Sequence, residues 1–474
     1  MSGAGALEFA WSLDRKAGNL SRQLADSIRR AIIEGQLTTG DRLPSTRLIA
    51  SELSLARGTV TNAVELLIAE GLLEARAGAG TFVACDALAL KPAAAQQKHR
   101  AYTFRCAPDH PDIDEPAIAK LDLRPCRPSL EAFPLNIWRR CLSDAASALP
   151  SSDYGDPQGA PALRRAIVDY LRRARGLVTA EPNVIITNGA IHAMHLLARL
   201  LLDGNTSAVA ENPGYPLARQ VLGSTGAELH YCSIDHAGMV LDELPGKRSK
   251  PALAYVTPSH QFPIGSRLSL TRRHHLIEWA QHTGALIIED DYDGEFRYDV
   301  PPLAPLANLS SEQVIYCGTF SKTMFPGLRI GFAIAPQPIA AAMAQLRAIS
   351  EYAPSDLVQR ALTTFIESGE YERHILRMRR IYAAKRKALA KGLAGAGEIT
   401  GIESGLHALV DLAPDHKAEE ISARLRAQDA LLPALSRYNF VADEARNALV
   451  FGYAAPSIKQ IEQGARMIAD ELTR

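Results

Sequence analysis

The most informative part of the sequence is the run Gly318-Thr319-Phe320-Ser321-Lys322. Three residues later it is followed by Pro326-Gly327-Leu328-Arg329-Ile330-Gly331. It follows the apolar run 314–317, which is typical of a buried strand. Lys322 offers an amine that can form a Schiff base with an aldehyde cofactor. Hydroxyl and guanidinium groups suit the phosphate of such a cofactor, and the nearby candidates are Thr319, Ser321 and Arg329. Together these groups point to pyridoxal 5′-phosphate (PLP), although a Ser-Lys pair alone would be weak evidence.

A second stretch, Ile287-Ile288-Glu289-Asp290-Asp291-Tyr292-Asp293, runs from an apolar strand into acidic residues. PLP withdraws electrons best when a buried Asp keeps its pyridine nitrogen protonated. We expect Asp290 in that role, and Tyr292 near the ring hydroxyl or the lysine. The alternatives are a solvated acidic turn or a metal cluster, and no nearby histidine spacing supports a metal.

Two further loops follow expected strands. Gly189 and Ala190 come after the strand 184–187 and precede a helix, so their backbone N–H groups could bind a phosphate. Tyr215 ends the run Glu211-Asn212-Pro213-Gly214-Tyr215 and could stack on the pyridine ring. An ordinary strand–helix turn and a buried core tyrosine are the alternatives.

The first 86 residues predict a separate unit of three helices and a hairpin. Apolar positions at helical spacing predict helices over 20–37, from Pro44-Ser45-Thr46, and over 57–70. In the second helix Leu48, Ile49 and Leu53 are expected on one face. Leu72–Val83 reads as two strands joined by a Gly-rich turn. This is the order of a winged helix-turn-helix, and a small protein-interaction module is the alternative.

Residues 19–83 resemble the winged-helix domain of GntR-family regulators. The similarity rests on Gly40–Arg47 (GDRLPSTR), on Ala56–Val60 (ARGTV) and on Gly78–Val83 (GAGTFV). The resemblance implies binding to a double-stranded DNA operator through Ser45, Arg47, Arg57, Thr59, Thr61 and Gly78. Ala56 departs from the family pattern, because a Ser or Thr usually caps the recognition helix there; the loss costs about 1 kcal/mol unless Ser54 substitutes.

Residues 122–474 resemble fold-type I aminotransferases, and more narrowly the MocR/GabR-type subfamily of GntR regulators. The runs that carry this similarity are Tyr154–Gly159 (YGDPQG), Thr257–Pro263 (TPSHQFP), Glu289–Tyr298 (EDDYDGEFRY) and Gly318–Lys322 (GTFSK). The subfamily senses a ligand through PLP, usually as a domain-swapped homodimer.

The resemblance also assigns roles to single residues. Lys322 would be the Schiff-base lysine, Asp290 would pair with the pyridine nitrogen beside Tyr292, and Tyr215 would stack on the ring. Tyr154 would reach the phosphate of the partner subunit's cofactor, and Gln261 or its neighbours would lie near the ring hydroxyl. The phosphate would be bound by Gly189, Ala190, Thr319, Ser321 and Arg329.

Three positions of the second region depart from the family pattern. Ile191 replaces a frequent Gln, and Ile264 replaces a small hydroxyl residue. Aminotransferases usually place a carboxylate-binding Arg where this chain has Val450 or a neighbour, with Arg446 the nearest arginine. We therefore expect a regulator that senses an amine, an amino acid or PLP by aldimine exchange at Lys322, and keep an active aminotransferase as the alternative.

The bulk composition agrees with a globular α/β protein of two or more domains. The 474 residues carry 52 basic and 52 acidic side chains, and the six cysteines include no C-x-x-C pair, so neither a zinc site nor a disulfide framework is expected. We expect a winged helix over 1–86, a linker over 87–121 and an aminotransferase-like domain over 122–474. That domain should have a mostly parallel sheet with helices on both faces and a smaller α/β subdomain from about 385. No signal segment or membrane span is visible, so the cytoplasm is the expected compartment.

Overall fold

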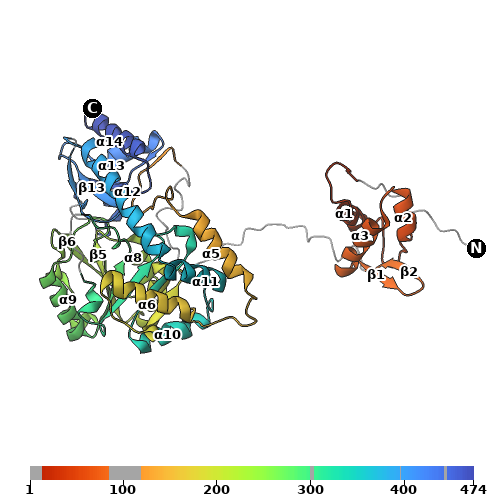
Figure 1. The fold of residues 1–474 in the computed structure, drawn as a ribbon, viewed down its shortest axis with the longest axis horizontal. Helices are drawn as coiled ribbons and strands as arrows, with labels where there is room; N and C mark the ends of the chain where they lie inside the picture. The colour runs from red at the N-terminus through yellow and green to blue at the C-terminus, as the bar shows by residue number, and fades with distance from the viewer. Residues whose placement is uncertain (1–12, 85–118, 299–303, 396, 442–445, 474) are drawn as a thin grey trace, which may run out of the picture. The chain divides into compact units, whose positions relative to one another are not determined.

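The computed structural model describes residues 13–84, 119–298, 304–395, 397–441 and 446–473 (Figure 1). The chain divides into two compact units between residues 104 and 105. Most of the expected linker 87–121 lies outside the described residues. Its end does not, because Leu121 already belongs to a strand of the second unit.

The first unit is the expected winged helix-turn-helix. It consists of α1 (Leu20–Ile33), α2 (Thr46–Glu52), α3 (Arg57–Ala69) and the antiparallel strands β1 (Leu73–Arg76) and β2 (Gly80–Val83). Its core is apolar and includes Leu24, Ile28, Ile49, Val60, Leu67 and Val83. The expectation that Leu48 shares the buried face of α2 was wrong: Ile49 is fully buried, whereas Leu48 is 47% exposed.

The second unit contains an eight-stranded sheet with the order β4-β11-β10-β9-β8-β5-β6-β7. The five adjacent strands from β10 to β6 pair in parallel, while β11 and β7 pair antiparallel to their neighbours. The sheet is thus mostly parallel, as expected. The strands are β4 (Val184–Thr187), β5 (Ser207–Asn212), β6 (Glu228–Asp235), β7 (Gly238–Met239), β8 (Pro251–Val256), β9 (Leu286–Asp291), β10 (Val314–Thr319) and β11 (Gly331–Ile334).

Helices cover both faces of this sheet because apolar side chains point to both faces in alternation. Ile288 and Ile315 pack towards α7 (Ala190–Leu201), α8 (Pro216–Gly223) and α10 (Gln337–Ala348). Their neighbours Ile287 and Val314 pack towards the opposite layer. That layer consists of α5 (Leu135–Ser147), α6 (Pro161–Arg175), α9 (Leu270–Thr283) and α11 (Asp356–Glu367).

A smaller lobe completes the second unit and has its own core. It holds the sheet β12-β13-β15 and the parallel pair β14-β3, flanked by two helices. Helix α12 (Glu370–Gly392) joins the lobes, since Tyr371 belongs to the large core and Tyr382 to the small one (Figure 1). The remaining elements of the lobe are β3 (Leu121–Asp122), β12 (Glu398–Thr400), β13 (His407–Asp411), α13 (Ala418–Ala427), β14 (Ala430–Leu431), β15 (Ala448–Gly452) and α14 (Ile458–Leu472).

None of the described helices combines the length and the apolar character that crossing a membrane requires.

The buried His374 of α12 makes the stability of the second unit depend on pH. Its ring is 1% exposed and meets the Phe133 ring edge-on at 5.6 Å, and burial lowers its pKa to about 4. The unfolded chain binds this proton near pH 6.5. The stability contributed by neutral His374 is therefore complete above that pH and is lost as the pH falls towards 4.

We expect the His374→Leu variant to lose less stability than the wild type between about pH 7 and pH 5, by at most about 2 kcal/mol. Urea unfolding at the two pH values measures the difference. An equal loss in both proteins would show that His374 does not titrate in this window.

Candidate functional site

The carboxyl ends of six strands, β4 and the five parallel strands from β10 to β6, meet at one edge of the large sheet. Most of the predicted cofactor residues lie there, at the ends of β4, β5, β9 and β10 or just beyond them. Ligands of open α/β sheets bind at this edge. A cavity of about 380 Å³ opens at it and is lined, among others, by Gly189, Ala190, Tyr215, Asp290, Tyr292, Thr319, Ser321, Lys322 and Arg329.

Asp290 lies at the floor of this cavity and is 4% exposed. Its Oδ2 accepts a hydrogen bond of 2.9 Å from the Tyr255 hydroxyl, whereas its buried Oδ1 has no hydrogen-bond partner among the described residues. Burial raises the pKa of the Asp290 carboxyl to about 7. A protonated ring nitrogen would give Oδ1 a partner and stabilise the charged carboxylate.

Hydroxyl groups and a guanidinium surround the start of α7. The Thr319 hydroxyl donates to Ser321 Oγ at 3.0 Å, and Arg329 donates to the carbonyl oxygen of Asn188 at 2.6 Å. Gly189 has φ +88°, and a Cβ there would lie 3.4 Å from the Arg329 guanidinium. Glycine therefore leaves this corner open for an anion between the guanidinium and the helix N-terminus.

Two tyrosines line the walls of the cavity. Tyr215 directly precedes α8, and its ring meets Phe262 edge-on at 5.7 Å. Tyr292 is 8% exposed, and its hydroxyl lies 3.1 Å from Nδ1 of His260. Burial raises the pKa of the Tyr292 phenol well above its usual value.

Two predicted residues do not line the cavity. The amide of Gln261 is buried and donates to Glu211 and to the backbone carbonyls of Pro213 and Phe262. Phe262, the next residue, lines the cavity instead. Tyr154 is 81% exposed and contacts Tyr352, with ring centroids 5.1 Å apart.

The departures from the family pattern change this site. Ile191 lines the cavity with an apolar side chain, whereas Ile264 packs near Val450, which is fully buried. Arg446 pairs with Asp411 and Thr400. Neither position 450 nor Arg446 supplies a guanidinium to the cavity.

Sequence reasoning missed several residues that line the cavity. Arg124, Cys126 and Arg127 come from the segment after β3, and Arg437 and Tyr438 come from the small lobe. The sequence shows arginines at 124, 127 and 437. No local pattern shows that these segments come close to Lys322.

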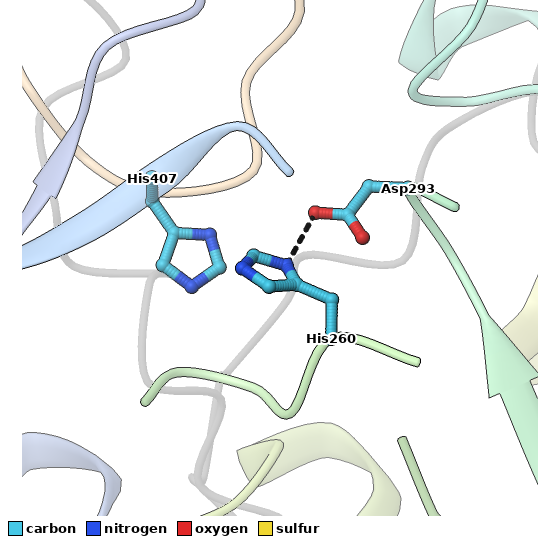
Figure 2. Close-up of side chains that lie close together, drawn as sticks. All are labelled: His260, Asp293 and His407. Carbon is cyan, nitrogen blue, oxygen red and sulfur yellow. Dashed lines mark hydrogen bonds and ion pairs between the residues drawn. The ribbon is translucent and has the colours of Figure 1, made fainter. Parts of the chain in front are cut away.

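The fold also assembles a cluster that no spacing in the sequence reveals. His260, Asp293 and His407 are all buried, and each offers a ligand-type atom within 4.8 Å of the others (Figure 2). The sequence argument against a metal near Asp290 considered only histidines close by in the sequence, and so it could not detect this cluster. The four described cysteines Cys126, Cys141, Cys232 and Cys317 are free thiols.

In the winged-helix unit, the predicted DNA residues lie at the start of two helices and at the hairpin tip. Ser45 caps α2, its Oγ accepting from the Leu48 amide at 3.2 Å. Arg57 begins α3 and is exposed, and α3 has no side-chain cap at Ala56, as expected. Arg47 and Gly78 are also exposed, whereas Thr59 and Thr61 are half-buried.

Comparison with known proteins joins the two units into one family. Residues 20–83 match the model for bacterial regulatory proteins of the gntR family, and residues 128–468 match aminotransferase class I and II. The chain is 34% identical over 468 residues to the probable rhizopine catabolism regulatory protein MocR of Rhizobium meliloti, covering 95% of this chain and 94% of that protein.

The chain belongs to the MocR-type regulators of the GntR family. A second relative of this MocR-type regulator is the pyridoxine biosynthesis transcriptional regulator PdxR of Corynebacterium glutamicum, with 34% identity over 439 residues, or 92% of each chain. Among solved structures, the kynurenine aminotransferase of Pyrococcus horikoshii superposes with a TM-score of 0.69 at 24% identity, covering 74% of this chain and 90% of that one. This likeness shows the fold of the second unit.

PLP is the cofactor of this regulator, and the residues of the cavity fit it. Oδ1 of Asp290 faces no partner among the described residues, and the corner at Gly189 and Arg329 suits a phosphate. When bound, PLP supplies an aldehyde carbon that accepts amines and a ring that withdraws electrons.

We expect purified protein with PLP to be yellow and the Lys322→Ala variant to lose the absorption band of the Schiff base, because only a lysine amine can hold the cofactor covalently. Absorption spectra after incubation with PLP and gel filtration measure this. Lys387→Ala, at an exposed lysine of α12, is the matched control and should stay yellow. A colourless wild type would contradict binding of the cofactor, and a yellow Lys322→Ala variant would contradict the assignment of Lys322.

We expect Arg57→Ala to weaken specific operator binding by about 1–3 kcal/mol, roughly 10- to 100-fold, because a guanidinium at the start of a recognition helix can bond a guanine bidentately. Fluorescence anisotropy at fixed salt measures the affinity. Arg30→Ala, at an exposed arginine of α1, is the control. Equal losses in both variants would place the base-reading surface elsewhere.

Proposed function

We propose that this regulator senses a primary amine at Lys322 and converts its binding into a change in DNA binding. The effector would be an amine, an amino acid or PLP itself. An effector amine would displace the Lys322 amine from the cofactor, and the changed cavity would favour another arrangement of the protein. The observation that carries the proposal is that Lys322 and Asp290 line one cavity, in a chain whose N-terminal residues form a winged helix.

The roles of single residues form part of this proposal. Lys322 carries the cofactor, Asp290 pairs with its ring nitrogen beside Tyr292, and Tyr215 stacks on the ring. Gly189, Ala190, Thr319, Ser321 and Arg329 hold the phosphate. Their common position in the cavity supports these roles. Ser45, Arg47, Arg57, Thr59, Thr61 and Gly78 contact DNA.

The alternative is an active aminotransferase with an accessory DNA-binding domain. That activity needs a cation that orients the substrate carboxylate, and the family position for it holds the buried Val450. The nearest arginine, Arg446, pairs with Asp411 instead. The loss of the arginine at the family position favours sensing over turnover, and Arg124, Arg127 and Arg437 are the cavity residues that could bind an effector carboxylate instead.

We further propose that the regulator works as a domain-swapped homodimer in the cytoplasm, where its DNA is. Leu149, Tyr154 and Ile349 are at least 81% exposed, although they are apolar or aromatic. Side chains of this kind gathered on one surface mark interfaces, and Tyr154 contacts Tyr352, which joins the segments around 150 and 350. In such a dimer Tyr154 would reach the phosphate of the partner's cofactor.

The test of the sensing function measures DNA affinity while ligands are titrated. The DNA is a fragment from the region upstream of the neighbouring genes, and the ligands are PLP and then single amines and amino acids. We expect one of these ligands to change both the cofactor spectrum and the DNA affinity of the wild type several-fold. The Lys322→Ala variant should not respond to the amine, because it lacks the exchangeable Schiff base.

Two outcomes would contradict the proposal. An identical response in wild type and Lys322→Ala would separate sensing from Lys322. Turnover of an amino acid with a keto acid, on the order of 1 s⁻¹ or faster, without any change in DNA affinity would favour the aminotransferase.

A further inference from the structure

His260 lies behind Tyr292 and is bonded on both sides. Its Nδ1 lies 2.9 Å from Oδ2 of Asp293 (Figure 2). Its Nε2 lies 3.3 Å from the carbonyl oxygen of Gly401. The His260 and Asp293 side chains are each 2% exposed, so water does not screen their interaction.

These contacts favour one protonation state of His260. A carbonyl oxygen only accepts hydrogen bonds, so Nε2 must carry a hydrogen to bond Gly401. A carboxylate also only accepts, so Nδ1 must carry a hydrogen to bond Asp293. An imidazole with hydrogens on both nitrogens is an imidazolium, and the Asp293 carboxylate compensates its buried charge.

The same geometry determines what the Tyr292 hydroxyl can do. Its oxygen lies 3.1 Å from Nδ1 of His260. Because a protonated Nδ1 has no lone pair, Tyr292 cannot donate to it, and the Tyr292 oxygen can only share the Nδ1 hydrogen with Asp293. The phenol's own hydrogen is then left for an acceptor in the cavity that Tyr292 lines.

We propose that His260 is a positioning residue of the cofactor cavity, a buried imidazolium that makes Tyr292 a hydrogen-bond donor towards the cofactor's ring oxygen. The proposal rests on the proposed function in one respect only, that the cofactor occupies the cavity lined by Tyr292. The charge state of His260 does not depend on it.

His260 is contacted by residues of both lobes of the second unit. Asp293 and Tyr292 follow β9 of the large lobe, whereas Gly401, Glu403 and His407 belong to the small lobe. Burial opposes the charge on His260, while Asp293, Gly401 and Glu403 favour it, and the net effect raises its pKa. A movement of the small lobe that withdraws Gly401 would therefore remove one of the contacts that favour the imidazolium.

The neighbouring His407 is the neutral partner. Its Nε2 lies 3.1 Å from the carbonyl oxygen of Pro263, and its Nδ1 lies 3.9 Å from the Cys126 sulfur. Burial and the nearby charges of His260 and Lys322 lower the pKa of His407 well below its usual value. Two adjacent histidines, with ring centroids 5.0 Å apart, thus hold different charges.

A metal ion is the competing occupant of the cluster, and the packing disfavours it. A Cβ on Gly405 (φ +76°) would come within 2.5 Å of both Nδ1 of His260 and Oδ2 of Asp293. The backbone of Gly405 therefore covers the edge at which these two atoms would share an ion. Nδ1 of His260 and Oδ2 of Asp293, which would have to bind the ion, already share a hydrogen bond with each other.

The first experiment reads the charge directly. The full-length chain is labelled with ¹⁵N-histidine, and nitrogen shifts are recorded near pH 7 with and without PLP, with the His260→Gln variant assigning the resonance. We expect both nitrogens of His260 to be protonated in both samples. One unprotonated nitrogen would overturn the proposal, and so would an equimolar metal ion in purified protein that is absent from His260→Gln.

The second experiment reads the effect on the cofactor. Loss of a donor to the ring oxygen destabilises the deprotonated cofactor, so we expect Tyr292→Phe to raise the midpoint of the spectral pH titration by about one unit. His260→Gln should raise it in the same direction, and the double variant should not exceed Tyr292→Phe alone. His275→Gln, at an exposed histidine of α9, should leave it unchanged.

A purely structural role would give a different pattern. His260→Gln would then lower stability while leaving the midpoint unchanged, or its effect would persist fully in the Tyr292→Phe background; either result overturns the proposal. If the wild type does not bind PLP, the proposed function fails, and the ¹⁵N measurement still decides the state of His260.

Discussion

The burial of the Asp290 carboxylate constrains the rest of the cavity. A carboxylate with one bonded oxygen and one oxygen without a partner is costly in a low-dielectric site, and the chain keeps it at the end of a central strand. Tyr255, on the adjacent strand, can satisfy only Oδ2. The remaining oxygen, Oδ1, would be stabilised by a ligand that carries a positive charge or donates a hydrogen bond. Cofactor binding and the stability of this strand end are therefore coupled.

Residues of both the large and the small lobe line this cavity. Cys126 and Arg437 approach from outside the large sheet, while Asp290 lies in β9 and Lys322 follows β10. Helix α12 contributes to both cores, so the lobes are continuous in packing as well as in sequence. Val450 is buried where the family pattern places a carboxylate-binding arginine, whereas Arg124, Arg127 and Arg437 bring guanidinium groups to the cavity from other segments.

Local pattern predicted the strands that lead into the cavity and the lining residues at their ends, because each predicted loop follows an apolar run whose end is marked by a polar or glycine residue. Val184–Thr187 matches β4, and the residues around Asp290 and Lys322 lie at strand ends as expected. Side-chain direction inside a turn has no period, which is why Gln261 points away while Phe262 lines the cavity. Contacts between distant segments left no signal either: Cys126 and His407 are 281 residues apart in sequence.

The pairing of β3 with β14 determines where the chain enters the second unit. Leu121 and Asp122 form parallel pairs with Ala430 and Leu431, and Leu121 is buried in the core of the small lobe. The residues that lead back to the winged helix thus leave from the small lobe and not from the large sheet. A rotation of the small lobe would therefore move the point at which the chain enters the second unit, while the large sheet keeps its place around Lys322.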